Sequence, residues 1–225
     1  MTPLTLLALA LAAGCASGHH SATSAPAAPT SYKSFSANVT NAWFPLRAGS
    51  VYRYRGVKDG ERSREVMAVT HRTKTIDGAR CVVVSDLLYL RGKLEERTRD
   101  YYTQDTDGNV WYFGEDTAEL DPRGKVTTRE GTWHAGVDGA KPGIFMYAHP
   151  RVGQAARQEY WKGHAEDHFR VVSVLGRNAV LTQEWTPLEP GVLDHKLYVR
   201  GVGTAFEQTE RGGDERNELV SVTRG

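Results

Sequence analysis

The sequence predicts an all-β protein, a single antiparallel meander of about ten strands folded as an open half-barrel, a closed barrel or a sandwich. Three observations support this prediction. Glycine-containing turn dipeptides recur at short intervals, and the segments between them are rich in Val, Tyr, Thr, Trp and Phe. No window keeps the i, i+3, i+4, i+7 apolar stripe of an amphipathic helix over three turns.

The turns are expected at six dipeptides. An Asp-Gly pair between alternating runs favours a tight hairpin turn, because both residues tolerate positive φ angles. The expected turns are Asp59-Gly60, Asp77-Gly78, Arg91-Gly92, Asp107-Gly108, Arg123-Gly124 and Gly212-Gly213. The strands are expected at 51–55, 65–74, 81–90, 94–104, 109–113, 126–134, 157–175, 179–186, 192–200, 202–210 and 216–223.

The composition excludes several classes of protein. The 28 basic and 27 acidic residues leave a formal net charge of +1, so no basic surplus exists to bind nucleic acid. With 40% hydrophobic and 24% charged residues, the chain has an ordinary globular composition. No run of about 20 apolar residues occurs that could span a bilayer as a helix. We therefore expect a folded protein with no nucleic-acid partner.

Residues 1–14 are predicted to be a signal peptide. Residues 4–14 form an apolar run that is too short to span a bilayer but typical of a signal-peptide core. The run ends directly before Cys15 and resembles the lipobox of bacterial lipoprotein precursors. That resemblance implies an exported protein held on a lipid bilayer by an acylated, palmitate-bearing Cys15, at the outer membrane in a Gram-negative cell. The alternative is an ordinary secretory signal with an incidental cysteine.

Residues 15–34 are expected to form a disordered Ala/Ser/Pro tether, and 35–225 a single β domain. All Trp, Tyr and Phe residues of the chain lie at or beyond Tyr32, which marks a sharp change of composition. Cys81 opens a Cys-Val-Val-Val run and is expected to be a buried small hydrophobic residue rather than a nucleophile. A disulfide framework is excluded.

The body resembles a group of uncharacterised bacterial secreted lipoproteins. The likeness rests on the opening N-A-W-F-P-L-R-A-G-S-V-Y-R-Y-R-G at 41–56 and the closing Y-V-R-G-V-G-T-A-F-E-Q-T at 198–209. W-Y-F-G-E at 111–115 and E-W-T-P-L-E-P-G-V-L-D-H-K at 184–196 are similar to a subset of that group. More distantly, the body resembles the open half-barrels of lipoprotein carriers, in which a curved sheet holds an apolar ligand. The resemblance implies a fold and no activity.

The first candidate site lies in W-K-G-H-A-E-D-H-F-R at 161–170. In an extended strand, alternation puts His164, Glu166 and His168 on one face. Two imidazoles and a carboxylate could ligate a divalent ion or transfer protons. Two basic residues share that face and disfavour a cation, so a solvated strand face is the preferred interpretation and no metal site is predicted.

The second candidate site is an aromatic platform beside a carboxylate, formed by Tyr102, Trp111, Tyr112 and Glu115. Aromatic faces beside acids suit sugar rings, and paired carboxylates serve glycoside hydrolysis. Alternation places Trp111 and Tyr112 on opposite faces, so at least half of the aromatic residues must belong to the core. A core strand is therefore the preferred interpretation here.

The function stays open between two classes. No nucleophile elbow, P-loop or Rossmann glycine motif is present, so neither a catalytic residue nor a cofactor is predicted. The first hypothesis is a non-catalytic binding module for an apolar or envelope-derived ligand or partner. The alternative is a secreted hydrolase of a glycan or ester that uses Glu115 together with the face of His164, Glu166 and His168.

Overall fold

The computed structural model describes residues 31–225. The predicted signal peptide, Cys15 and the tether up to residue 30 lie outside the described residues. Every regular element of the described part is a strand, so the predicted all-β class is confirmed. Residues 31–225 contain no helix long and apolar enough to cross a membrane.

The sheet has 15 strands, more than the number predicted. Their bounds are β1 Val51–Lys58, β2 Glu61–Ile76, β3 Ala79–Leu90, β4 Lys93–Gln104, β5 Val110–Leu120, β6 Val126–Thr128, β7 Trp133–His134, β8 Lys141–Met146, β9 Ala155–Arg157, β10 Glu159–Tyr160, β11 His168–Leu175, β12 Ala179–Trp185, β13 Leu193–Val199, β14 Gly203–Arg211 and β15 Arg216–Thr223.

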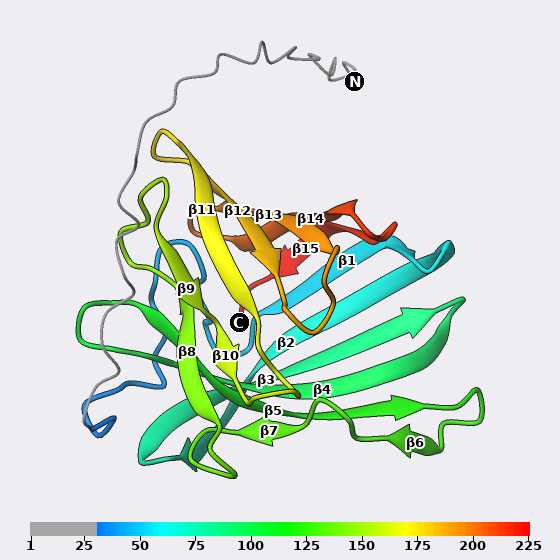
Figure 1. The fold of residues 1–225 in the computed structure, drawn as a ribbon, viewed down its shortest axis with the longest axis horizontal. Coiled ribbons are helices and arrows are strands. Elements are labelled where there is room, and N and C mark those ends of the chain that lie inside the picture. The colour runs from blue at the N-terminus through cyan, green and yellow to red at the C-terminus, as the bar shows by residue number, and fades with distance from the viewer. Residues whose placement is uncertain (1–30) are drawn as a thin grey trace.

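The strands form one antiparallel sheet that curves into a nearly closed barrel (Figure 1). The main path runs β10-β8-β5-β4-β3-β2-β1-β15-β14-β13-β12-β11-β9, and the short strands β6 and β7 both pair with β5. The two ends of the path meet at one unsealed seam, formed by residues 155–160. Its first half, β9, pairs with β11, and its second half, β10, pairs with β8. The predicted barrel architecture is therefore confirmed over the sandwich, and the barrel is nearly closed except at this seam.

The predicted turn dipeptides all lie between strands. Asp59 and Gly60 have φ angles of 53° and 72°, and Arg91 and Gly92 have φ angles of 51° and 80°. Two consecutive positive φ angles define the turn whose twist matches that of a two-stranded antiparallel ribbon. The turn chemistry of the sequence thus determines where the wall of the barrel reverses direction.

Two predicted strands are interrupted. The segment expected as one strand over 157–175 consists of β9, β10 and β11, because the chain reverses in a tight turn between Trp161 and Ala165. Gly163 has a φ of 77° in this turn. The segment 126–134 likewise divides into β6 and β7, and β8 was not predicted. A short reversal inside an alternating run leaves no mark on the alternation, so periodicity missed it.

A β-bulge in β5 changes which side chains face the inside of the barrel. Asp100 is opposite Glu115 and Tyr102 is opposite Tyr112, so two residues of β5 stand opposite one residue of β4. Gly114 occupies the bulge with a φ of 131°. Because one residue is inserted, Tyr112 and Glu115 face the same side although they are three positions apart.

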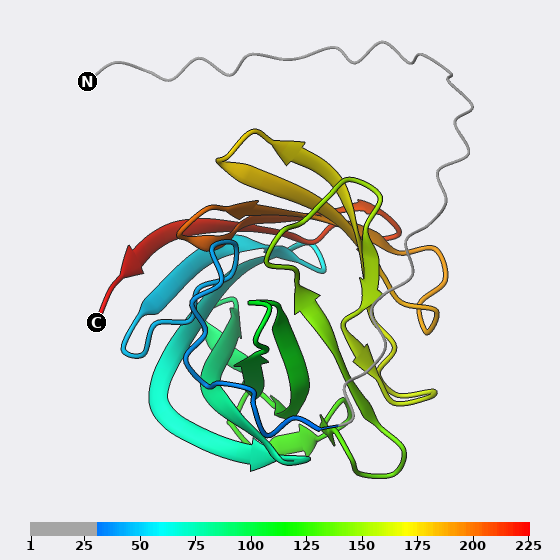
Figure 2. The same ribbon diagram turned by 90° about the vertical axis from the view of Figure 1, so that its left-hand side faces the viewer.

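The segment before β1 crosses one end of the barrel, where it is drawn in blue in Figure 2. The ring of Phe44 lies 4.6 Å from that of Phe145 and 5.3 Å from that of Tyr102. The Asn41 side chain donates a 2.8 Å hydrogen bond to the Gly108 carbonyl and thereby ties the segment to the β4–β5 turn. The segment that contains Phe44, Pro45 and Leu46 therefore closes this end of the barrel, and we call it the plug.

Candidate functional site: an acidic barrel lumen

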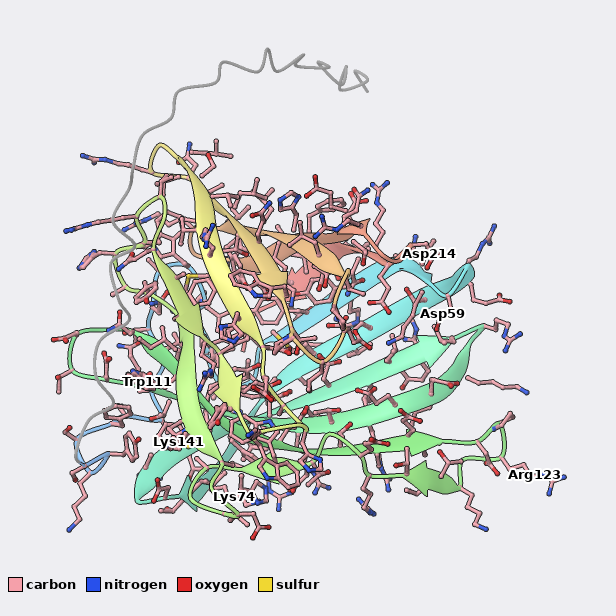
Figure 3. All side chains as sticks on the ribbon, in the orientation of Figure 1. Asp59, Lys74, Trp111, Arg123, Lys141 and Asp214 are labelled. Atoms are coloured by element: carbon pink, nitrogen blue, oxygen red, sulfur yellow. The ribbon has the colours of Figure 1, made fainter. Side chains whose placement is uncertain are left out.

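Acidic side chains line the inside of the barrel, which we call the acidic lumen. Figure 3 shows oxygen-tipped side chains pointing into the space that the strands enclose. They come from strands on opposite walls, since alternate residues of each strand point inward. The carboxylates of the acidic lumen are Glu65, Asp86, Asp100, Glu115, Glu159, Asp167, Glu184 and Glu207.

One lysine, Lys196 of β13, lies among these carboxylates. Its Nζ atom is 3.1 Å from Glu184 Oε2 and 3.2 Å from Glu207 Oε1. Burial disfavours the charged form of Lys196, but the two carboxylates outweigh burial and raise its pKa well above the usual value. Tyr198 and Thr182 donate further hydrogen bonds to Glu184, at 3.1 and 2.9 Å. Lys196 is therefore positively charged, and it is already paired with Glu184 and Glu207.

The remaining carboxylates have no basic partner within ion-pair distance among residues 31–225: Glu65, Asp86, Asp100, Glu115, Glu159 and Asp167. Burial in the lumen raises the pKa of each of them, and neighbouring carboxylates raise it further. The pKa of Asp86 and of Asp100 is raised to about 7, and that of Glu159 to about 8. Close like charges in a confined space make the ionised forms costly.

Aromatic rings separate the carboxylates. The rings of Tyr102 and Tyr112 are stacked, with centroids 4.8 Å apart. The Tyr112 hydroxyl donates a 2.8 Å hydrogen bond to Asp100 Oδ1, and the Trp133 indole donates one of 2.7 Å to Glu159 Oε2. The lumen thus combines ring faces with acidic groups.

Two adjoining cavities occupy the acidic lumen. One has a volume of about 170 Å³ and is bordered by Glu65, Asp86 and Glu207, and the other has about 190 Å³ and is bordered by Glu115, Glu159 and Glu184. Both are also lined by Tyr102, Phe145 and Lys196. For scale, an engineered cavity of about 150 Å³ holds one benzene ring.

The first cavity continues toward the end of the barrel opposite the plug. A neighbouring hollow of about 120 Å³ shares Glu65 and Glu207 with it and is lined further out by Lys58 and Arg216. Asp59 and Asp214 mark the hairpin tips at this end in Figure 3, and Asp214 accepts a hydrogen bond from the backbone of the β1–β2 turn. A ligand would therefore reach the lumen past these tips.

Two buried side-chain polar atoms have no hydrogen-bond partner within residues 31–225, and both belong to residues that line the lumen. They are Gln158 Nε2, at the seam beside Glu159, and Asn217 Oδ1, beside Glu65. Gln158 is 5% exposed. Gln158 Nε2 is a donor and Asn217 Oδ1 is an acceptor, so the lumen presents unpaired hydrogen-bonding atoms of both kinds among the described residues.

Comparisons with known proteins add a likeness of fold. No protein-family model matches the chain, and no curated protein is similar to it at a significant level. Two solved structures match. A candidate exported protein with a YmcC-like fold from Bacteroides fragilis is 13% identical, with 81% of this chain and 99% of that chain covered and a TM-score of 0.35. A candidate lipoprotein from Parabacteroides distasonis is 9% identical, with 80% and 98% covered and a TM-score of 0.40. Likeness at this level carries no conclusion about function.

The predicted aromatic platform divides between the two sides of the wall. Tyr102, Tyr112 and Glu115 line the lumen together. Trp111 lies on the other side, where its ring packs 5.7 Å from Phe35 and its indole donates a 2.8 Å hydrogen bond to Asp105. The expected split of the aromatic residues is thus observed, and the bulge at β5 adds Glu115 to the lumen.

The predicted face of His164, Glu166 and His168 does not exist as one strand face. His164 is exposed in the turn before β11 and stacks on Trp161, with ring centroids 3.9 Å apart. Glu166 accepts a 2.8 Å hydrogen bond from the Gly163 backbone, and His168 begins β11. Burial, followed by a nearby arginine, lowers the pKa of His168. No group of three metal-ligating side chains is placed to hold a metal within residues 31–225.

Sequence reasoning missed most of the acidic lumen. It passed over Lys196, whose chain neighbour His195 lies on the outer face, 3.1 Å from Glu210. The signal in the sequence was that acidic residues lie two positions from apolar residues and so share a strand face with them, as Glu65 does with Met67 and Asp86 with Val84. Cys81 is fully buried as expected, and burial raises the pKa of its thiol to about 12.

Proposed function

We propose that this chain is an exported lipoprotein of the cell envelope, anchored through an acylated Cys15, whose barrel binds a small organic cation in the acidic lumen. The observation that carries the proposal is the ring of carboxylates around a single lysine. Lys196 is engaged by Glu184 and Glu207, and the other lumen carboxylates have no basic partner among the described residues. A bound amine would supply the missing positive charge and hydrogen-bond donors.

The lining favours an amine over a metal ion or a purely apolar ligand. In the described residues, the acidic side chains do not form a group that could hold a metal. The stacked rings of Tyr102 and Tyr112, with Phe44 and Phe145 beside them, offer faces to a cation. An apolar ligand would leave the carboxylates and Asn217 Oδ1 without a donor, whereas an ammonium group can donate hydrogen bonds to both. The two cavities suit a body of one or two rings, or a flexible chain of similar volume.

The test is calorimetric titration of the full chain carrying Cys15→Ser, with spermidine as the probe and calcium chloride as the metal comparison at matched ionic strength. We expect saturable binding of spermidine at about pH 8, where Asp86 and Asp100, with pKa values of about 7, are largely ionised, and weaker binding at about pH 5.5. The variant Asp100→Asn/Glu115→Gln should weaken binding roughly tenfold or more, because charge-assisted hydrogen bonds are lost.

The matched control is Glu95→Gln/Glu130→Gln, which removes the same charge from two exposed residues outside the lumen. Equal weakening in the control and lumen variants, or no saturable binding by wild type, would refute the lumen as a cation site. The Cys15→Ser background tests the anchor separately, since it should leave the membrane fraction once the acyl chains are gone.

A further inference from the structure

A second cavity lies on the outside of the barrel wall and has the opposite charge. It measures about 380 Å³ and is formed over β3, β4 and β5 and the residue that follows β6. We call it the arginine groove, after Arg97, Arg99 and Arg129. Ser85 and Leu87 of β3 complete its floor beside Ala118 of β5.

The three guanidinium groups of the arginine groove are free to meet a ligand. Arg97, Arg99 and Arg129 are exposed, and within residues 31–225 none of them forms an ion pair or a side-chain hydrogen bond. An exposed guanidinium group without a protein partner can form two parallel hydrogen bonds with a carboxylate or a phosphate. The unpaired cations converge on one hollow instead.

Asp116 is the one acidic residue that lines the groove, and its negative charge is already paired with other side chains. Its Oδ2 atom lies 3.3 Å from Lys74 Nζ, and its Oδ1 atom lies 2.9 Å from His134 Nε2. The Tyr101 hydroxyl also donates a hydrogen bond to it. Burial opposes the charge on Asp116, but Tyr101, Lys74 and His134 outweigh burial and lower its pKa. The groove therefore keeps a net positive charge.

We infer that the arginine groove binds a phosphate group carried on an organic body. A phosphate carries nearly two negative charges and several acceptor oxygens, which match three guanidinium groups better than a single carboxylate does. The Ser85 hydroxyl adds a donor. The volume exceeds that of the phosphate and falls in the range of small-molecule sites, so Leu87 and Ala118 are left to contact the organic part.

The source of the phosphate is either a soluble phosphorylated molecule or the headgroup of an anionic lipid. Two probes separate them, both applied to the full chain carrying Cys15→Ser so that no acyl anchor contributes. The soluble probe is inorganic pyrophosphate, measured by calorimetry. The membrane probe is sedimentation with phosphatidylcholine vesicles that contain or lack phosphatidylglycerol.

The groove variant is Arg97→Gln/Arg99→Gln, and the matched control is Arg123→Gln/Arg177→Gln, which removes the same charge at two exposed hairpin tips. We expect wild type and control to bind at least one probe and the groove variant to bind it roughly tenfold or more weakly. Pyrophosphate binding identifies a soluble source, and binding only to phosphatidylglycerol vesicles identifies a headgroup.

Two results would overturn the inference: neither probe binds wild type, or the groove and control variants weaken binding equally. The inference does not depend on the acidic lumen. Spermidine titration of the groove variant should match that of wild type, so failure of the lumen proposal and failure of this one are distinguishable.

Discussion

The inner and outer faces of β4 carry opposite charge on alternate residues of the same strand. Asp100 points into the acidic lumen, and its chain neighbour Arg99 points into the arginine groove. The formal net charge of +1 conceals this separation completely. The comparison shows that period-two alternation can give a strand of a nearly neutral chain an anionic inner face and a cationic outer face.

The two faces also differ in how tightly their charges are held. Inside, Lys196 and Glu184 depend on each other, because Glu184 is 6% exposed and water cannot replace its partner. Outside, the arginines are exposed and each can be solvated alone. Substitutions inside should therefore change stability, whereas substitutions outside should change binding with little effect on stability.

The largest effect is expected from Lys196→Met. It leaves Glu184 and Glu207 without their cation, at a cost of about 3 kcal/mol in the free energy of unfolding at neutral pH. Urea unfolding followed by tryptophan fluorescence measures it. The control is Lys58→Met, whose 3.3 Å pair with Glu215 lies at the surface and is worth about 0.5 kcal/mol. Equal losses in the two variants would remove the distinction between the inner and outer charges.

A smaller loss, about 2 kcal/mol, is expected from Gly114→Ala. A Cβ atom there would lie 2.2 Å from the backbone oxygen of Trp133, and the φ of 131° is unfavourable for any other residue. Since the bulge holds Glu115 inside and Asp116 outside, spermidine binding should fall along with stability. Gly139→Ala, in an open turn with a φ of 81°, should cost only about 1 kcal/mol. A Gly114→Ala variant as stable as Gly139→Ala would show that the bulge is dispensable.

The last prediction concerns the pH dependence of stability. Asp86 and Asp100 have a pKa of about 7 in the folded protein, against about 4 when unfolded. Between these values the folded state binds more protons than the unfolded state, so the contribution of Asp86 and Asp100 to stability is greatest below about pH 4 and is lost as the pH rises through about 7. Asp100→Asn should make the decline less steep, because one of the two groups that release a proton over this range is then absent. Thermal melts across this range measure it, and a wild-type melting temperature that rises with pH would contradict the raised pKa values.

The turns and the strand composition were sufficient to predict the fold class. Asp59-Gly60 and Arg91-Gly92 act locally, because a positive φ at two successive residues reverses the chain whatever surrounds it. The reversal at Gly163 was missed because it lies inside a run that alternates well enough to look like one strand. The candidate face of His164 and His168 required one continuous strand. Because the chain reverses there, His164 lies in the turn and His168 begins β11.

The candidate platform was predicted only in part. Alternation correctly assigned Trp111 and Tyr112 to opposite faces. It could not place Glu115 beside Tyr112, because the inserted residue at Gly114 exists only through pairing with β4. Nor could it reveal that Lys196, far along the chain, lies across the lumen from the acids of β2 and β3.

By itself, the sequence determined the features that depend on neighbouring residues: the all-β class, the hairpin turns and the alternation of side chains along each strand. The signal peptide, the acylated Cys15 and the tether before residue 31 are also local patterns, and they stay predictions. The tertiary structure decided which face of the sheet became the inside. The sheet closes because residues 155–160 contain both β9, which pairs with β11, and β10, which pairs with β8. Closure brings distant carboxylates into one confined space, where limited solvation raises their pKa and one lysine cannot neutralise them.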